Sequence, residues 1–212
     1  MRTTCKTLAV AGALAACGAA CAQSNVIQFG VTEYTTHSRT NGITGIGVPP
    51  GADAKVGDAT TVIFTYERLF TPNIGVELVL GIPPRIKAKA TGSVAFLGDD
   101  VLSAKNLAPT AFVNYHFGQP GDTWRPFAGI GINYTKFEDA KSKLAPDVRM
   151  GDSTGWAVHA GTDYNINKDW ALWASVSALK VKSKVVAAGT TVLQTTVDYR
   201  PIVYSAGIGY RF

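Results

Sequence analysis

The sequence predicts an all-β protein, an eight-stranded antiparallel transmembrane up-and-down β-barrel. Three observations predict this fold. Eight segments alternate apolar residues with small or polar ones at a period of two, which is the periodicity of strands and not of helices. Long and short connections between these segments alternate strictly, and aromatic residues gather beside the short connections.

The alternation is clearest in three segments. Residues 74–82 are IGVELVLGI, in which large apolar residues alternate with glycine, glutamate and valine. Residues 124–138 and the terminal YSAGIGYRF follow the same rule, with one apolar face and one face of small or polar residues. The full set of predicted strands spans residues 25–36, 59–70, 73–84, 105–117, 124–138, 153–166, 169–182 and 196–212.

The connections between these strands indicate how the barrel is arranged. Those at 69–73, 118–122 and 165–168 are short and carry turn residues, whereas those near 37–58, 85–104, 139–152 and 183–195 are long. An outer-membrane barrel has tight turns at one end and long loops at the other, with an apolar band facing lipid. Because backbone groups in hydrocarbon cannot bond to water, only a closed sheet is viable there. We therefore expect a monomer in the bacterial cell outer membrane, in contact with its lipids.

A soluble, lipocalin-like barrel is the alternative, with its apolar face turned inward around a ligand. The aromatic residues favour the membrane barrel, because they gather at one end as an interfacial girdle does. These residues are Phe70, Phe117, Trp124, Trp170, Tyr210 and Phe212.

Residues 1–22 are predicted to be a signal peptide, and residues 23–212 the outer-membrane β-barrel. Arg2 and Lys6 precede an apolar run, and Ala20-Cys21-Ala22 fits a cleavage site before Gln23. A lipobox ending at Cys17 is a second interpretation of the same leader. All three cysteines lie in the leader, so the barrel would hold no disulfide. The net charge of +5 is too mild to indicate a nucleic-acid partner.

Five blocks of sequence resemble the OmpW family of small outer-membrane barrels, in the family's order. They are TPNIGVELVLGIPP (71–84), NYHFG (114–118), WRPFAGIGINYTKF (124–137), GTDYNINKDW (161–170) and SAGIGYRF (205–212). The resemblance implies a narrow, largely apolar lumen that admits small hydrophobic molecules and releases them sideways toward the membrane. It implies passive transport across the outer membrane without a cofactor.

The resemblance also implies a hydrophobic constriction formed by an apolar residue of the third strand and a tryptophan early in the sixth. Val79 occupies the first position, on a face predicted to be luminal. Thr154 stands at the expected tryptophan position, and Trp156 follows two residues later. Val79, Trp156 and Thr154 are thus the candidate solute pathway, although the weak alternation of the sixth strand leaves a lipid-facing Trp156 equally open.

Side-chain parity predicts which residues face the lumen. The interior of an eight-stranded barrel is only wide enough for side chains or one small ligand. We expect a partly polar plug near the turn end, in which Glu67 and Glu77 bond to arginine or lysine, and in which Glu77 and Arg211 form an ion pair or assist transport. The predicted luminal set is Gln28, Gly30, Thr61, Glu67, Glu77, Val79, Asn114, His116, Gly129, Asn133, Trp173, Ser175 and Arg211.

Two other functions compete with transport. One is a structural or receptor barrel that conducts nothing. The other is a lipid-modifying enzyme, for which His159 and Asp163 are the best pair, although no nucleophile is recognisable beside them. None of His37, His116 and His159 has metal-ligand spacing. We therefore expect neither an enzyme nor a metal site.

Two surface features predict partners. The lysine-rich runs RIKAK (85–89) and KVKSK (180–184) lie at strand ends on the long-loop side, where they either meet lipid phosphates or are simply solvated. Tyr210 and Phe212 resemble the terminal signal that the outer-membrane insertion machinery recognises.

Overall fold

The computed structural model describes residues 25–188 and 192–212, and it confirms the all-β barrel. The predicted signal peptide and the choice between Gln23 and Cys17 as the mature N-terminus lie outside the described residues. Within those residues, no helix has the length and hydropathy needed to cross a membrane. The elements are β1 (Asn25–Thr36), β2 (Arg39–Thr40), β3 (Ala52–Val56), β4 (Ala59–Leu69), β5 (Ile74–Gly81), β6 (Arg85–Gly92), the short helix η1 (Ala95–Leu97), β7 (Leu102–Leu107), β8 (Thr110–His116), β9 (Trp124–Ser142), β10 (Asp147–Met150), β11 (Ser153–Asn165), β12 (Trp170–Leu179), β13 (Lys182–Ala188), β14 (Val192–Asp198) and β15 (Pro201–Arg211).

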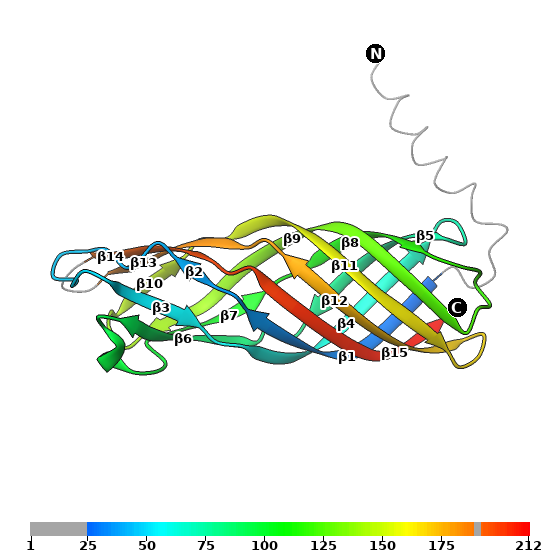
Figure 1. Ribbon diagram of the computed structural model, residues 1–212, viewed down its shortest axis with the longest axis horizontal. Coiled ribbons are helices and arrows are strands. Elements are labelled where there is room, and N and C mark those ends of the chain that lie inside the picture. The colour runs from blue at the N-terminus through cyan, green and yellow to red at the C-terminus, as the bar shows by residue number, and fades with distance from the viewer. Residues whose placement is uncertain (1–24, 189–191) are drawn as a thin grey trace, which may run out of the picture.

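Eight of these strands close the barrel in the order β9, β11, β12, β15, β1, β4, β5 and β8, with β8 pairing back to β9 (Figure 1). Every pair is antiparallel. The first and last strands lie side by side, and Asn25 and Phe212 exchange backbone hydrogen bonds of 3.1 and 2.9 Å. At the short-turn end, the observed strand limits agree with the predicted ones to within one residue.

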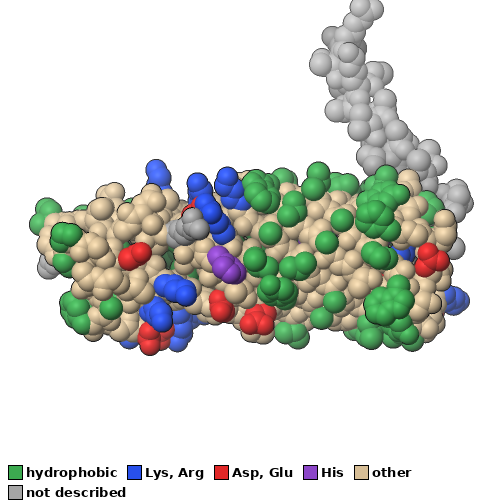
Figure 2. All heavy atoms as spheres, viewed as in Figure 1, with side chains coloured by type: hydrophobic (Ala, Val, Ile, Leu, Met, Phe, Trp, Pro, Cys, Tyr) green, Lys and Arg blue, Asp and Glu red, His purple; other side chains and the backbone are tan. Residues whose placement is uncertain are grey.

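The apolar face points outward, as an outer-membrane barrel requires. Ile130 and Ile132 expose 70% and 67% of their surface, and Phe29 exposes 56%. The largest fully buried side chains are instead polar and include Arg125, Asn114 and Asn133. Figure 2 shows the hydrophobic side chains spread over the half of the barrel that carries the short turns. A lipocalin-like barrel would reverse this distribution, so that alternative is wrong.

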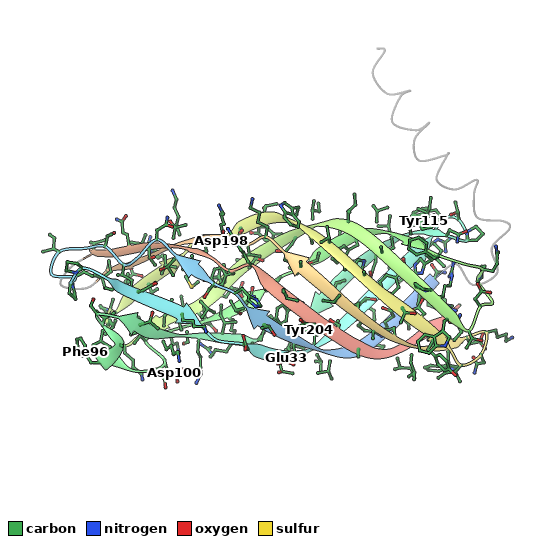
Figure 3. The ribbon with its side chains drawn as sticks, viewed as in Figure 1. Glu33, Phe96, Asp100, Tyr115, Asp198 and Tyr204 are labelled. Carbon is green, nitrogen blue, oxygen red and sulfur yellow. The ribbon has the colours of Figure 1, made fainter. Side chains whose placement is uncertain are left out.

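The prediction of four long loops is only partly right. Within 37–58 only β2 and β3 are strand, whereas more than half of 85–104, 139–152 and 183–195 is strand. β2, β14, β13 and β10 form one sheet, and β3, β6, β7 and the far part of β9 form another, so the cylinder continues beyond the apolar band (Figure 1). Phe96 and Asp100 mark this far part in Figure 3, and Tyr115 marks the short-turn end. The two sheets enclose an apolar core of Val56, Ile86, Ala88, Ala104, Phe137, Val181, Val185, Val197 and Tyr199.

The wall changes its pairing where the two parts of the cylinder meet. β1 pairs with β4, but β2 pairs with β14 and β3 pairs with β6, so no strand ladder joins β2 to β3 within the described residues. Side chains bridge this β2–β3 seam instead. The Thr36 amide donates to Asp58 Oδ1 at 2.8 Å, the Val56 amide donates to Ser38 Oγ at 3.2 Å, and the Thr40 hydroxyl donates to the Asp53 carboxylate. One backbone bond follows beyond β2, from Ile43 to Ala52 at 2.9 Å.

Candidate functional site

A cluster of polar side chains fills the barrel near its short turns. Asn114 lies at its centre, because its side-chain amide donates to Glu67 Oε1 at 3.0 Å and to Glu77 Oε2 at 2.9 Å. His159 Nε2 lies 2.6 Å from Asn114 Oδ1, and His116 Nε2 lies 2.9 Å from Glu67 Oε1. We call these five residues, together with Arg125, Asp163 and Arg211, the polar cluster. All eight are buried.

The charges of the polar cluster pair differently from the prediction. Arg211 donates to Asp163 Oδ2 at 3.2 Å, and Glu77 bonds to Asn114. The expected ion pair between Glu77 and Arg211 is therefore wrong. Arg125 donates to the carbonyl oxygen of Pro72 in the first short turn. The expectation that arginine or lysine would hold Glu67 and Glu77 is also wrong, since an amide and a histidine hold them.

A small cavity of about 40 Å³ lies beside the polar cluster. Its apolar lining includes Val79, Phe112 and Trp173, and its polar lining includes Glu77 and His159. A second cavity of about 30 Å³ shares Tyr34, Ala108 and Leu179 with the first and extends toward the far sheets. Because one water molecule needs roughly 10–15 Å³, neither cavity forms an open pore in this conformation.

Trp173 is the luminal tryptophan, which confirms its predicted luminal position, although the constriction was assigned to Trp156 or Thr154 instead. It pairs with Gly207, which pairs with Gly30, so its indole lies over two glycines. A Cβ on Gly30 would meet the indole Cζ2 at 2.8 Å. The sequence does indicate this position. Trp173 follows the outward-facing Leu172 and so points to the opposite face, and two glycines lie on the neighbouring strands.

Trp156 and Thr154 do not line the lumen, so their assignment to the solute pathway is wrong, and the lipid-facing alternative for Trp156 is confirmed. Trp156 exposes 54% of its surface on the outer face, and Thr154 is exposed beside it. The inward positions of β11 are Ser153, Ala157, His159 and Asp163, all buried, so the even-numbered residues point outward. Val79 does line the cavity, and Glu77, Asn133 and Arg211 are buried inside the barrel.

Asn133 lies apart from the polar cluster. Its amide donates to Thr110 Oγ1 at 2.8 Å, and its Oδ1 accepts from Thr135 at 2.6 Å. It also reaches the carbonyl oxygens of Ala108 and Pro109 at 3.4 and 3.3 Å, where β7 gives way to β8. Asn133 therefore satisfies backbone groups at a break in the ladder.

His159 and Asp163 do not form the pair that an enzyme would need. The ring of His159 stacks on Phe112 with 3.8 Å between centroids, and its Nε2 faces Asn114. No hydrogen bond or ion pair joins it to Asp163 among the described residues, because Asp163 is held by Arg211. The described part of the chain also holds no group of three or more His, Cys, Asp or Glu suited to a metal ion.

An open groove of about 630 Å³ lies outside the β2–β3 seam. Thr36 and Val56 line this groove and also line the upper interior cavity. These two residues therefore contact both the interior cavity and the groove outside the wall. Lys87 and Asp100, which form an ion pair of 2.8 Å, lie on the groove's far side.

The OmpW family model matches residues 23–212. The chain belongs to the OmpW family. Outer membrane protein W of Vibrio cholerae serotype O1 is 32% identical over 168 residues, which cover 76% of this chain and 77% of that protein. The protein is therefore an outer-membrane barrel of the OmpW family, located in the bacterial outer membrane, with its short turns on the periplasmic side.

Two further relatives of this OmpW-family chain are informative. The crystal structure of the outer membrane protein OprG from Pseudomonas aeruginosa has a TM-score of 0.82 and 26% identity, and the match covers 90% of this chain and 96% of OprG. The dibenzothiophene metabolism operon protein PahQ from Pseudomonas aeruginosa is 25% identical over 165 residues, covering 77% of this chain and 76% of PahQ.

We propose that the C-terminal strand of this OmpW-family barrel carries the signal for the insertion machinery. Tyr210 stacks on Phe212 with 6.1 Å between centroids and also contacts Trp170, and Phe212 is half exposed. We expect deletion of Phe212 to lower the amount of assembled barrel while synthesis continues. Phe212→Ala keeps the two backbone bonds to Asn25 and should lower it as well. Quantitative blotting of folded and unfolded barrel tests this, and normal assembly of both variants would contradict it.

Proposed function

We propose that this OmpW-family barrel passively passes small hydrophobic molecules across the outer leaflet and releases them sideways through the β2–β3 seam, without catalysing a reaction. The supporting observation is that Thr36 and Val56 line both the upper interior cavity and the outer groove. A small movement of this part of the wall would join the inside of the barrel to its surroundings.

The polar cluster supports a sideways exit over a straight one. A hydrophobic solute moving toward the periplasm would have to displace Asn114 from two buried carboxylates and Asp163 from Arg211. Separating buried charged groups from their partners costs several kcal/mol. The apolar upper lining offers no such penalty, so the solute would leave above the polar cluster.

The seam is one of two places where the far sheets are not joined by a ladder; the other lies between β9 and β10, which share no pairing among the described residues. The eight barrel strands themselves are joined by ladders, such as the pairing of β1 with β15 from Val26 to Thr36. The β2–β3 seam is favoured as the exit because Thr36 and Val56 line both the upper interior cavity and the outer groove there.

At the seam, opening breaks the bonds from the Thr36 amide to Asp58 and from the Thr36 hydroxyl to the Gly57 carbonyl oxygen, those of Ser38 and Thr40, and one backbone bond beyond them. Each such bond contributes only about 0.5–1.5 kcal/mol net. The free energy needed to open the seam is therefore small.

The name of PahQ ties that relative to the metabolism of dibenzothiophene, an apolar aromatic compound. This supports an apolar solute for the present chain. The test is uptake of radiolabelled dibenzothiophene by cells with and without the protein. We expect faster initial uptake in cells that carry it, whereas equal uptake would remove the transport proposal and leave a structural or receptor role.

Val79 gives a sharper test of the solute pathway. Val79→Phe would fill the cavity of about 40 Å³ next to Phe112 and Trp173. We expect uptake to fall about fivefold while stability changes by less than about 1.5 kcal/mol, because the added ring occupies existing space. Leu78→Phe is the matched control, because the neighbouring Leu78 is exposed on the outer face. Equal uptake by both variants would show that the cavity is not on the pathway.

A further inference from the structure

The outer wall carries a row of three lysines that make no ion pair among the described residues. Lys180, Lys182 and Lys184 alternate with the buried Val181 and Ser183, so all three side chains are exposed on one face. They extend over about 13 Å of chain, at roughly 3.3 Å per residue. Three cations without an ion pair, at the start of β13 and just before it, form a concentrated positive surface.

Several other basic residues of the far sheets are paired with carboxylates. Lys105 and Arg85 reach Asp139 at 2.7 and 3.9 Å, and Lys136 reaches Glu138 at 2.8 Å. The hydrogen bond from Lys105 lowers the pKa of Asp139 below its ordinary value. In the groove at the seam, Lys55, Lys87 and Lys89 face Asp58, Asp99 and Asp100, so the charges balance. The lysines at 180–184 differ, because no equal number of carboxylates faces them.

The acidic residues on the two sides of the row already have other partners. Asp152 lies between Gly151 and Ser153, which bond to Lys184 and Lys182, and its carboxylate accepts from the Tyr134 hydroxyl at 2.6 Å. Asp198 lies opposite Lys182 on β14, and its Oδ2 accepts from Arg200 Nε at 3.0 Å (Asp198 is labelled in Figure 3). Lys184 lies opposite Thr196, which carries no charge. The three lysines outnumber the flanking carboxylate of Asp152, so the row keeps a net positive charge for a partner outside the chain.

An apolar surface begins directly below these lysines. The Lys180 amide donates to the Trp156 carbonyl oxygen at 3.0 Å, so the two residues are neighbours across β11 and the end of β12. Trp156 pairs with Ile132, and both are largely exposed. Val158 and Val176 expose 40% and 41% of their surface on the same outer face. Figure 2 shows Lys and Arg side chains collected just beyond the half that is rich in hydrophobic side chains.

We infer that Lys180, Lys182 and Lys184, together with Trp156 and Ile132, form a binding surface for a phosphorylated lipid of the outer leaflet. The lysines bind the phosphates of the head group, and the indole and isoleucine pack against the acyl chains. Ammonium groups are effective phosphate partners, and tryptophan favours the boundary between head groups and hydrocarbon. The outward-facing Trp156 thus serves in lipid binding and not in the lumen.

The test measures the affinity of the purified barrel, in detergent micelles, for fluorescent bisphosphorylated lipid A. We expect Lys180→Gln/Lys182→Gln/Lys184→Gln to bind at least about tenfold more weakly, since each lysine near a charged head group contributes roughly fivefold. Lys55→Gln/Lys87→Gln/Lys89→Gln removes the same charge from the balanced groove and should change affinity less than about twofold. Unchanged binding by the first variant, or an equal loss in the second, would overturn the inference.

Two further arms identify the ligand. Dephosphorylated lipid A should bind wild type and the 180–184 variant equally, and Trp156→Ser should weaken both lipid forms. Inositol hexakisphosphate, a soluble polyphosphate, should bind far more weakly than lipid A; equal affinity would show that the surface recognises phosphate without lipid. Heat-dependent gel mobility verifies that each variant is folded. If the 180–184 triple variant is not folded, Lys182→Gln alone replaces it, with an expected loss of affinity of roughly fivefold.

Discussion

Replacement of Asn114 by leucine is expected to lower the free energy of unfolding by about 3 kcal/mol. The change keeps the size of the side chain but removes both amide bonds to Glu67 and Glu77 and the acceptor that faces His159. Two buried carboxylates then lose a donor, and buried charges without partners are costly. Urea unfolding of the barrel in lipid vesicles, followed by tryptophan fluorescence, measures the change.

Thr32→Val is the matched control for this prediction. Thr32 is buried on the inner face and shares a neutral hydrogen bond of 2.9 Å with Ser205. Its loss should cost only about 1 kcal/mol. If the two variants lose the same stability, the polar cluster does not hold the periplasmic half of the barrel together as described.

Closing the β2–β3 seam with a disulfide is expected to reduce solute uptake at least about tenfold, because a wall that cannot open loses its permeable state. Thr40→Cys with Asp53→Cys places the two thiols where the native side chains already bond to each other across the seam. All native cysteines lie at positions 5, 17 and 21, so the engineered pair has no competing thiol in the barrel strands. Uptake of dibenzothiophene is measured under oxidising conditions and again after reduction, which should restore it.

Lys55→Cys with Lys89→Cys provides the control disulfide. These residues are opposite each other in the existing pairing of β3 with β6, so a bond there leaves the seam free. Uptake should be the same in the oxidised and reduced control. A control that loses as much uptake as the seam variant would argue that general stiffening of the outer sheets, and not closure of the seam, limits transport.

The sequence predicted the barrel well because each membrane strand has one face toward lipid. Period-two patterns such as IGVELVLGI specify both the strand and its orientation, and the short turns fix its periplasmic end. The far strands were expected to be loops, although RIKAKA in β6 also alternates. Some of their inward residues are small, including Ala88 and Ala104, so the alternation in hydropathy is weak at those positions before the partner sheet is known.

The site was harder to predict than the fold. Family register placed Thr154 at the constriction and left both orientations open for Trp156, whereas the inward polar residues His159 and Asp163 turn both of them outward. The partners of Glu77 could not be predicted, because Asn114 reaches it from another strand and only the barrel's register brings them together. The seam is a property of three-dimensional pairing, and no local pattern in residues 36–58 indicates it.

The most direct test of sideways release is to locate a bound apolar solute. Crystals of the barrel soaked in a brominated alkane would show the halogen by its anomalous scattering. We expect bromine beside Val79 and Trp173, or beside Thr36 and Val56 at the seam, with the polar cluster intact. Bromine among Asn114, Asp163 and Arg211, on a straight path to the periplasm, would contradict it.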